Sequence, residues 1–402
     1  MSDTTAEKRW LRLQLYQTFK PYLICAQLLC TAPSSCNAEC LIDQRSQRSY
    51  FKQARLLITA SILTSVVICG VQAIVQLIYV PMPFFTGVLY VNEVVLCIAI
   101  SVAAVNRGLS EEARCNRFVD TIIAVASAVP YTDWVDTVRY VRLRLQGICA
   151  TFVIVFALAL LCDYLHFGSI YATLFTLCAY LLPNVLGGVS IVQYCLGTLL
   201  VYRLQQNINR RLSSVDIIHE AYIVETKHHY LQLAHSASLL TRSYEVLILT
   251  IVFAGINVTS LQLLEIYQYL QQGESHTVYL TYNILWIFMQ LYMLLIVVFP
   301  SDMFMREQTR FGMVMFERVQ TVHEPHTKEL VRLIARLGLL TLGRKKIVSK
   351  ACGVLRLELS SLSSIFVALL SFMIILIQFD SGNLNKHNGA VTAIDSLYTT
   401  TS

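Results

Sequence analysis

The stretch that decides the fold is Leu56–Val80, LLITASILTSVVICGVQAIVQLIYV, which runs for 25 residues without an acidic or basic side chain. A helix needs about 20 apolar residues to cross the hydrocarbon core of a bilayer. The stretch is long enough to cross, and it is too long for the apolar core of a secretory signal, which has only about 7–15 residues. We therefore interpret it as the first membrane span.

Six further runs of this kind follow, and together they predict an all-α membrane protein with seven spans. The expected spans are Leu56–Val80, Phe84–Val105, Leu145–Cys162, Ser169–Tyr202, Val246–Leu270, Thr277–Pro300 and Leu357–Phe379. Of the 402 residues, 55% are hydrophobic and 14% are charged, whereas an average soluble protein is about 25% charged. This composition excludes an ordinary soluble enzyme, and a β-barrel would show alternating segments of about ten residues instead.

The basic residues indicate which way the spans run. Thirty of the 31 lysines and arginines fall on one side of the expected bundle, in segments 1–55, 106–144, 203–243 and 301–356. Only Lys386 falls on the other side. Because lysine and arginine concentrate in cytoplasmic loops, we expect a cytoplasmic N-terminus and an extracellular C-terminus. The same separation favours one long span over Ser169–Tyr202, since a break near Pro183 would reverse every later segment.

The long cytoplasmic segments have few helix breakers and carry apolar residues at helical spacing. We expect segments 203–243 and 301–356 to extend the spans as helices that pack in a bundle. The alternative is a pair of loose amphipathic loops on the membrane surface.

Motifs of enzymes are missing from the sequence, which has no P-loop, HExxH, GxSxG or GxGxxG in a strand–helix context. We therefore predict no enzymatic activity, no cofactor and no metal. A zinc site formed by Cys25, Cys30, Cys36 and Cys40 stays a weak alternative, because none of these cysteines forms a CxxC pair.

Three acidic residues fall within or beside the spans. Glu93 lies inside the second span and has to face protein or water, which makes a functional role as plausible as a structural one. Asp163 and Glu265 lie near the outer ends of the third and fifth spans, and we interpret both as interfacial.

The last span carries a narrow polar stripe. Ser360, Ser364, Ser371 and Gln378 are separated by 4, 7 and 7 residues, so they share one face of a helix whose other positions are mostly Leu, Ile, Val, Phe and Met. Such a stripe can pack against a neighbouring helix through small residues. It can also line a water-filled path when several copies surround an axis. The stripe alone does not separate the two interpretations.

The end of this span resembles the signature of insect gustatory receptors, which reads Thr-Tyr, five hydrophobic residues, then Gln-Phe. Gln378 and Phe379 match the signature, and the five residues before them are hydrophobic. Ser371 replaces the threonine and Phe372 replaces the tyrosine. The stretches Ala351-Cys352-Gly353 and Leu357–Ser364 also look like the family's approach to its last span. The length, the seven spans and the expected cytoplasmic N-terminus agree with this resemblance.

The resemblance implies a chemosensory cation channel in the plasma membrane of gustatory neurons, in their dendrites, axons or cell bodies. Four subunits, identical or shared with other gustatory receptors, would surround a pore and meet at a cytoplasmic anchor. The partners would be small organic tastants, cations in the pore and lipid, with no nucleic acid. The chain would divide into an N-terminal segment 1–55, six spans with a ligand pocket 56–300, an anchor segment 301–356, a pore helix 357–379 and a tail 380–402.

Carried onto this chain, the resemblance suggests two sets of site residues. Aromatic, amide and acidic residues on the outer halves of the spans are the expected ligand-binding set: Tyr90, Glu93, Tyr180, Tyr282, Trp286 and Gln290. The expected pore residues are Ser364, Ser371, Leu376, Ile377, Gln378 and Phe379. A ring of Leu376, Ile377 or Phe379 would close the pore by dewetting. Each of the ligand-binding residues can equally be a packing residue of the bundle.

Two other receptor classes compete with this interpretation. A channel of the insect odorant-receptor type has the same expected architecture, and only the motif in the last span argues against it. A G-protein-coupled receptor would place the N-terminus outside, which would put thirty basic residues on the wrong side. The ligand class is not encoded in any motif, and bitter or aversive compounds are simply the family's broad default.

Overall fold

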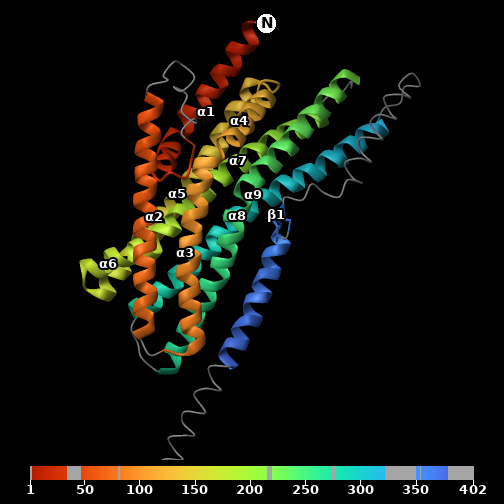
Figure 1. Ribbon diagram of the computed structural model, residues 1–402. Helices are drawn as coiled ribbons and strands as arrows, with labels where there is room; N and C mark the ends of the chain where they lie inside the picture. The colour runs from red at the N-terminus through yellow and green to blue at the C-terminus, as the bar shows by residue number, and fades with distance from the viewer. Residues whose placement is uncertain are drawn as a thin grey trace, which may run out of the picture.

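The computed structural model describes residues 2–33, 47–79, 82–214, 220–272, 277–321, 350–353 and 355–378. Nearly all of them are helical (Figure 1). The elements are α1 Ser2–Leu28, α2 Gln47–Tyr79, α3 Phe84–Ser110, α4 Glu112–Ala126, α5 Tyr131–Phe167, α6 Ile170–Thr176, a π-helical turn Leu177–Leu181, α7 Leu182–Ser214, α8 Glu220–Gln272, α9 Thr277–Thr321, the strands β1 Lys350–Ala351 and β2 Leu355–Arg356, and a last helix Leu359–Gln378.

Seven helices within the described residues are long and apolar enough to cross a membrane, which confirms the predicted number of spans. Each coincides with one of the expected apolar runs to within two residues at its ends or extends past it. The fourth is continuous from Ile170 to Ser214, so the run that sequence could have divided is one span.

The connections between helices separate into two ends of the bundle (Figure 1). The turns from α2 to α3 and from α5 to α6 lie at one end, together with the start of α9. The helices α1 and α4 and the far ends of α7 and α9 lie at the other end, which carries the basic segments. We call the first the turn end and the second the basic end. Among the described residues, the charge separation seen in the sequence is therefore a separation in space.

The fourth span changes its helical geometry next to a proline. Pro183 lacks the backbone N–H that would bond one turn back, and the π-helical turn Leu177–Leu181 immediately precedes α7. The side chain of Asn184 donates a 2.8 Å hydrogen bond to the carbonyl of Tyr180, which satisfies a backbone acceptor inside the irregular turn. Turns of this kind often mark functional positions in helices.

The N-terminal segment folds back onto the basic end of the bundle, a feature that the sequence did not reveal. Helix α1 packs against α4 and α5, Phe19 is fully buried, and Trp134 of α5 donates a 2.9 Å hydrogen bond to Gln14. Gly108 at the end of α3 permits this docking, since a Cβ there would lie 2.0 Å from the carbonyl oxygen of Cys30.

The helices α7, α8 and α9 continue past the apolar runs as one packed bundle. Tyr230 of α8 stacks on Phe311 of α9 with ring centroids 4.4 Å apart, and Asn209 of α7 donates a 2.8 Å hydrogen bond to the carboxyl of Glu307. Packed helices therefore replace the alternative of loose loops in the described parts of 203–243 and 301–321. Strand β1 pairs antiparallel with β2 where a helix was expected. Residues 322–349 and the tail 380–402 lie outside the described residues.

The last helix lies at the edge of the bundle and contacts the rest of the chain through one face (Figure 1). Leu369, Met373 and Leu376 form a small hydrophobic cluster with residues of α3 and α8. Most of its remaining apolar side chains are exposed in the single chain.

Candidate functional site

A cavity of about 400 Å³ lies at the turn end of the bundle, among six helices and the π-helical turn. Seven of its fifteen lining residues are tyrosine, phenylalanine or tryptophan, and its polar groups include three carboxyls. The lining residues are Gln76 on α2, Tyr90 and Glu93 on α3, Asp163 and His166 on α5, Tyr171, Ala172, Phe175 and Thr176 on α6, Tyr180 in the π-helical turn, Gln262 and Glu265 on α8, and Tyr279, Tyr282 and Trp286 on α9.

The structure brings five of the six residues expected to bind ligand around this cavity. They are Tyr90, Glu93, Tyr180, Tyr282 and Trp286. The sixth, Gln290, shares the helix face of Trp286 but lies one turn deeper, where it donates a 3.1 Å hydrogen bond to Asn184. Asn184 in turn bonds the carbonyl of Tyr180, so Gln290 is connected to the cavity wall through one intermediate residue. Ligand binding by these residues stays a prediction.

Glu265 is the carboxyl of the cavity with the most complete hydrogen bonding. Its Oε1 accepts a hydrogen bond from the hydroxyl of Tyr90, and its Oε2 accepts a 2.8 Å hydrogen bond from Tyr279. These bonds join α3, α8 and α9 at one point. A carboxyl with both oxygens bonded is a fixed part of the wall.

The other two carboxyls are less completely satisfied. Asp163 is only 2% exposed. It interacts with the Tyr282 hydroxyl, yet its Oδ2 has no hydrogen-bond partner. Glu93 is 5% exposed and forms no hydrogen bond with the described residues. Gln262 adds a buried carbonyl oxygen, Oε1, that also lacks a partner. The cavity therefore offers unused hydrogen-bond acceptors.

Several of these residues were not selected from the sequence. Asp163 and Glu265 were interpreted as interfacial, and this was wrong, because both are buried and line the cavity. A carboxyl at the end of a span can face either the lipid headgroups or the interior of the protein, and only the packing of the helices decides which of the two it faces. Gln262 carried a detectable signal, since it precedes Glu265 by three residues and so shares its helix face.

Trp286 and Tyr282 form the aromatic centre of the α9 wall. Their rings meet edge to face with centroids 6.0 Å apart, and Trp286 is almost fully buried. At the other extreme, Tyr171 is 74% exposed, and His166 and Gln76 are exposed as well. These three residues mark where the cavity approaches the surface.

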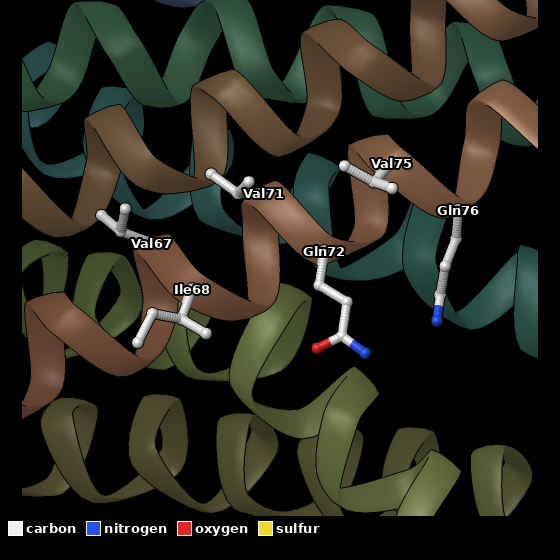
Figure 2. Close-up of a pocket in the computed structure, with 6 residues that line it drawn as sticks. All are labelled: Val67, Ile68, Val71, Gln72, Val75 and Gln76. Carbon is white, nitrogen blue, oxygen red and sulfur yellow. The ribbon is translucent and has the colours of Figure 1, made fainter.

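A second concavity lies on the outer surface of α2 and is shallow. Figure 2 shows that its six lining residues all come from this helix. Val67, Ile68, Val71 and Val75 are exposed apolar side chains, as expected on a helix surface that meets lipid. Gln72 and Gln76 extend from the same side of the helix in Figure 2. Gln76 lines both concavities, so the groove ends where the internal cavity begins.

The residues expected along the pore divide between two faces of the last helix. Ser364, Ser371 and Gln378 are exposed, while Leu376 is 3% exposed within the cluster on α3 and α8. Ile377 is half-buried against the same cluster. Phe379 lies outside the described residues.

The stripe and the packed face are on opposite sides of the last helix. Ser371 and Leu369 are two positions apart, which is about 200° around a helix. The hydroxyls of Ser364 and Ser371 bond carbonyls of their own helix, whereas the Gln378 amide forms no hydrogen bond with the described residues. Ile374 and Ile375 flank the stripe and are exposed.

Comparison with solved structures gives a fold match along most of the chain. The structure of the insect olfactory receptor OR5 from Machilis hrabei aligns with a TM-score of 0.66 and 10% sequence identity, covering 91% of this chain and 99% of that chain. The structure of the same receptor in complex with eugenol aligns with a TM-score of 0.64, the same identity and the same coverage. At this identity, the likeness establishes the fold alone.

No curated protein matches the sequence significantly. The family model described as 7tm chemosensory receptor matches residues 19–383, which is most of the chain. The match includes every span and all twelve residues expected at the two sites. The chain therefore belongs to the 7tm chemosensory receptor family.

Proposed function

We propose that this protein is a gustatory receptor: a cation channel in the plasma membrane of chemosensory neurons that opens when a small organic tastant occupies the cavity at the turn end. The observation that carries the proposal is the cavity itself. It has a volume in the range of small-molecule sites, mostly apolar walls and a few polar groups, as such sites usually have. The OR5 structure with eugenol supports a small organic ligand for this fold.

The last helix supports the channel half of the proposal. A helix with exposed apolar side chains and one exposed polar stripe is unlike a helix that faces lipid all round. In a tetramer, four copies of Ser364, Ser371 and Gln378 would face the axis. Neutral hydroxyls and amides can stabilise a passing cation without trapping it.

Two sets of apolar residues on the last helix can form the gate. Leu376 and Ile377 remain gate residues only if the last helix rotates, since they pack within the subunit. Ile374 and Ile375 already flank the stripe and can close a pore by dewetting without rotation.

The cytoplasmic anchor would be formed by the parts of α7, α8 and α9 that extend past the apolar runs. The subunits would meet there, as homo- or hetero-tetramers with other gustatory receptors. Bitter or aversive compounds are the proposed ligand group. The alternative is an odorant-receptor-type channel, which the fold supports equally because the solved relatives are olfactory receptors.

The test is a recording from cells that express only this chain, and from cells that also express one related receptor, during application of a tastant panel. The expected result is a ligand-evoked cation current that persists when G-protein signalling is blocked. A response abolished by that block would contradict the channel proposal and favour a G-protein-coupled mechanism.

A further inference from the structure

The charges around the cavity are unbalanced. Three carboxyls line it, from Glu93, Asp163 and Glu265, and none of its lining residues is lysine or arginine. His166 is the only lining residue that can become cationic, and it lies where the cavity approaches the surface. The sequence shows the same shortage, because only Lys386 among the 31 lysines and arginines falls outside segments 1–55, 106–144, 203–243 and 301–356. The described residues that line the cavity therefore supply no lysine or arginine to these acids.

The two incompletely satisfied acids determine what the cavity can bind. A buried carboxylate without a paired cation is costly, and a bound ligand of opposite charge removes that cost. Asp163 Oδ2 and Gln262 Oε1 are buried acceptors with no protein donor, and Glu93 forms no hydrogen bond with the described residues. A ligand that complements these atoms is positively charged or rich in N–H donors.

The walls indicate that this ligand is organic. Seven aromatic side chains line the cavity: Tyr90, Tyr171, Phe175, Tyr180, Tyr279, Tyr282 and Trp286. A cation placed over an aromatic face is attracted by the ring, most strongly by tryptophan, and aromatic cages are a recurrent means of holding quaternary ammonium groups. Within the described part of the chain, no three acidic, histidine or cysteine side chains converge closely enough to hold a metal ion. The acids are spread around a space that suits a larger cation.

We infer that the cavity selects organic cations, meaning protonated amines or quaternary ammonium compounds with an apolar body. The ammonium group would lie near Asp163 and Glu93, and the apolar body would contact the rings of Tyr282 and Trp286. Glu265, already bonded by two tyrosines, would hold the wall in place. This inference rests on the proposed function only in using the same cavity as the ligand site.

The test compares a cation with its neutral isostere. Benzyltrimethylammonium and neopentylbenzene have the same shape and differ in replacing the charged nitrogen by carbon. Binding of each to the full-length chain in lipid nanodiscs is measured by equilibrium dialysis, with binding to empty nanodiscs subtracted. We expect the ammonium compound to bind at least about tenfold more tightly. Equal affinity, tighter binding of the neutral compound, or no specific binding of the cation overturns the inference.

Isosteric variants identify which carboxylate is responsible for the tighter binding of the ammonium compound. Asp163→Asn and Glu93→Gln remove one carboxylate each, and we expect each to weaken ammonium binding about tenfold while neopentylbenzene binding changes less than about twofold. Asp302→Asn is the matched control, since Asp302 pairs with Arg306 at the basic end, far along α9 from the cavity. Cation binding that is unaffected by both cavity variants contradicts the assignment. If either variant fails to fold, the wild-type comparison still decides.

The dialysis result is independent of channel activity. A chain that binds the cation but carries no current would refute the proposed channel and leave this inference intact. A chain that conducts in response to neutral tastants but does not prefer the cation would support the proposed channel and refute this inference.

Discussion

The hydroxyl of Tyr279 on α9 lies 2.8 Å from Oε2 of Glu265 on α8, in the wall of the cavity at the turn end. The other oxygen of Glu265 accepts from Tyr90 on α3. One buried carboxyl thus connects the consecutive helices α8 and α9 to α3, which is distant in sequence. Any ligand-driven movement of α9 relative to α3 has to rearrange these bonds.

Tyr279→Phe tests the contribution of that contact to stability. Removing the hydroxyl leaves one oxygen of a buried carboxyl without its donor, which we expect to cost about 1–3 kcal/mol. The measurement is the thermal unfolding midpoint of the purified full-length receptor. Tyr171→Phe is the matched control, because Tyr171 is 74% exposed. An equal shift in both variants would show that the bond to Glu265 does not stabilise the fold.

Gly108→Ala tests the docking of the N-terminal segment. The added Cβ would lie 2.0 Å from the carbonyl oxygen of Cys30, so the segment after α1 has to move away. We expect a lower unfolding midpoint and less receptor at the cell surface. Gly147→Ala on α5 is the control, since nothing lies within 4 Å of its Cβ position; alanine there should be neutral or slightly stabilising. Wild-type behaviour of Gly108→Ala would contradict the docked position of the segment.

The orientation in the membrane is tested with epitope tags at the two ends of the chain. Thirty of the 31 lysines and arginines fall in the segments expected on one side of the membrane, which predicts that an N-terminal tag is protected and a C-terminal tag is accessible in intact cells. The measurement is antibody labelling before and after permeabilisation. An N-terminal tag that is labelled before permeabilisation would reverse the orientation and revive the G-protein-coupled alternative.

The candidate gate residues of the last helix are either exposed beside the polar stripe or buried against α3 and α8, and substitutions at the two kinds of position should differ in effect. Ile375→Ser changes an exposed position beside the stripe, and we expect it to raise the current in the absence of ligand by admitting water to the pore. Leu376→Ser changes a residue buried against α3 and α8. We expect it to reduce surface expression instead. Current recordings normalised to surface protein distinguish the two, and a ligand-free current only in Leu376→Ser would place the gate on the other face.

The spans could be predicted from the sequence because each depends on a local property, a long run of apolar residues. Helices α1 and α4 could not, since neither contains an apolar run long enough to span a membrane, and their positions depend on packing. Helix α1 lies against α4 and α5, and α4 lies mainly against α8. The polar stripe was also predictable from spacing alone. The face on which Leu376 packs was not, because that depends on which neighbouring helices the last helix meets.

The residues that line the cavity could likewise be predicted only in part from the sequence. Tyr282 and Trp286 were recognisable from their spacing of four on an apolar helix. Asp163 was not, because a carboxyl at the end of a span can face headgroups or protein, and hydropathy does not distinguish these. Its burial accompanies the packing of α5 against α9, where it interacts with the hydroxyl of Tyr282.

In the proposed receptor, one part of the chain binds the ligand and another conducts, and a single recording tests this division. Dose–response curves and reversal potentials are measured in the same cells for Trp286→Ala and Gln378→Ala. We expect Trp286→Ala to shift the half-maximal ligand concentration and to leave the permeability ratios unchanged. Gln378→Ala should change the permeability ratios or conductance more than the ligand sensitivity. Unaltered permeation in Gln378→Ala together with unaltered ligand sensitivity in Trp286→Ala would contradict the proposed division between ligand site and pore.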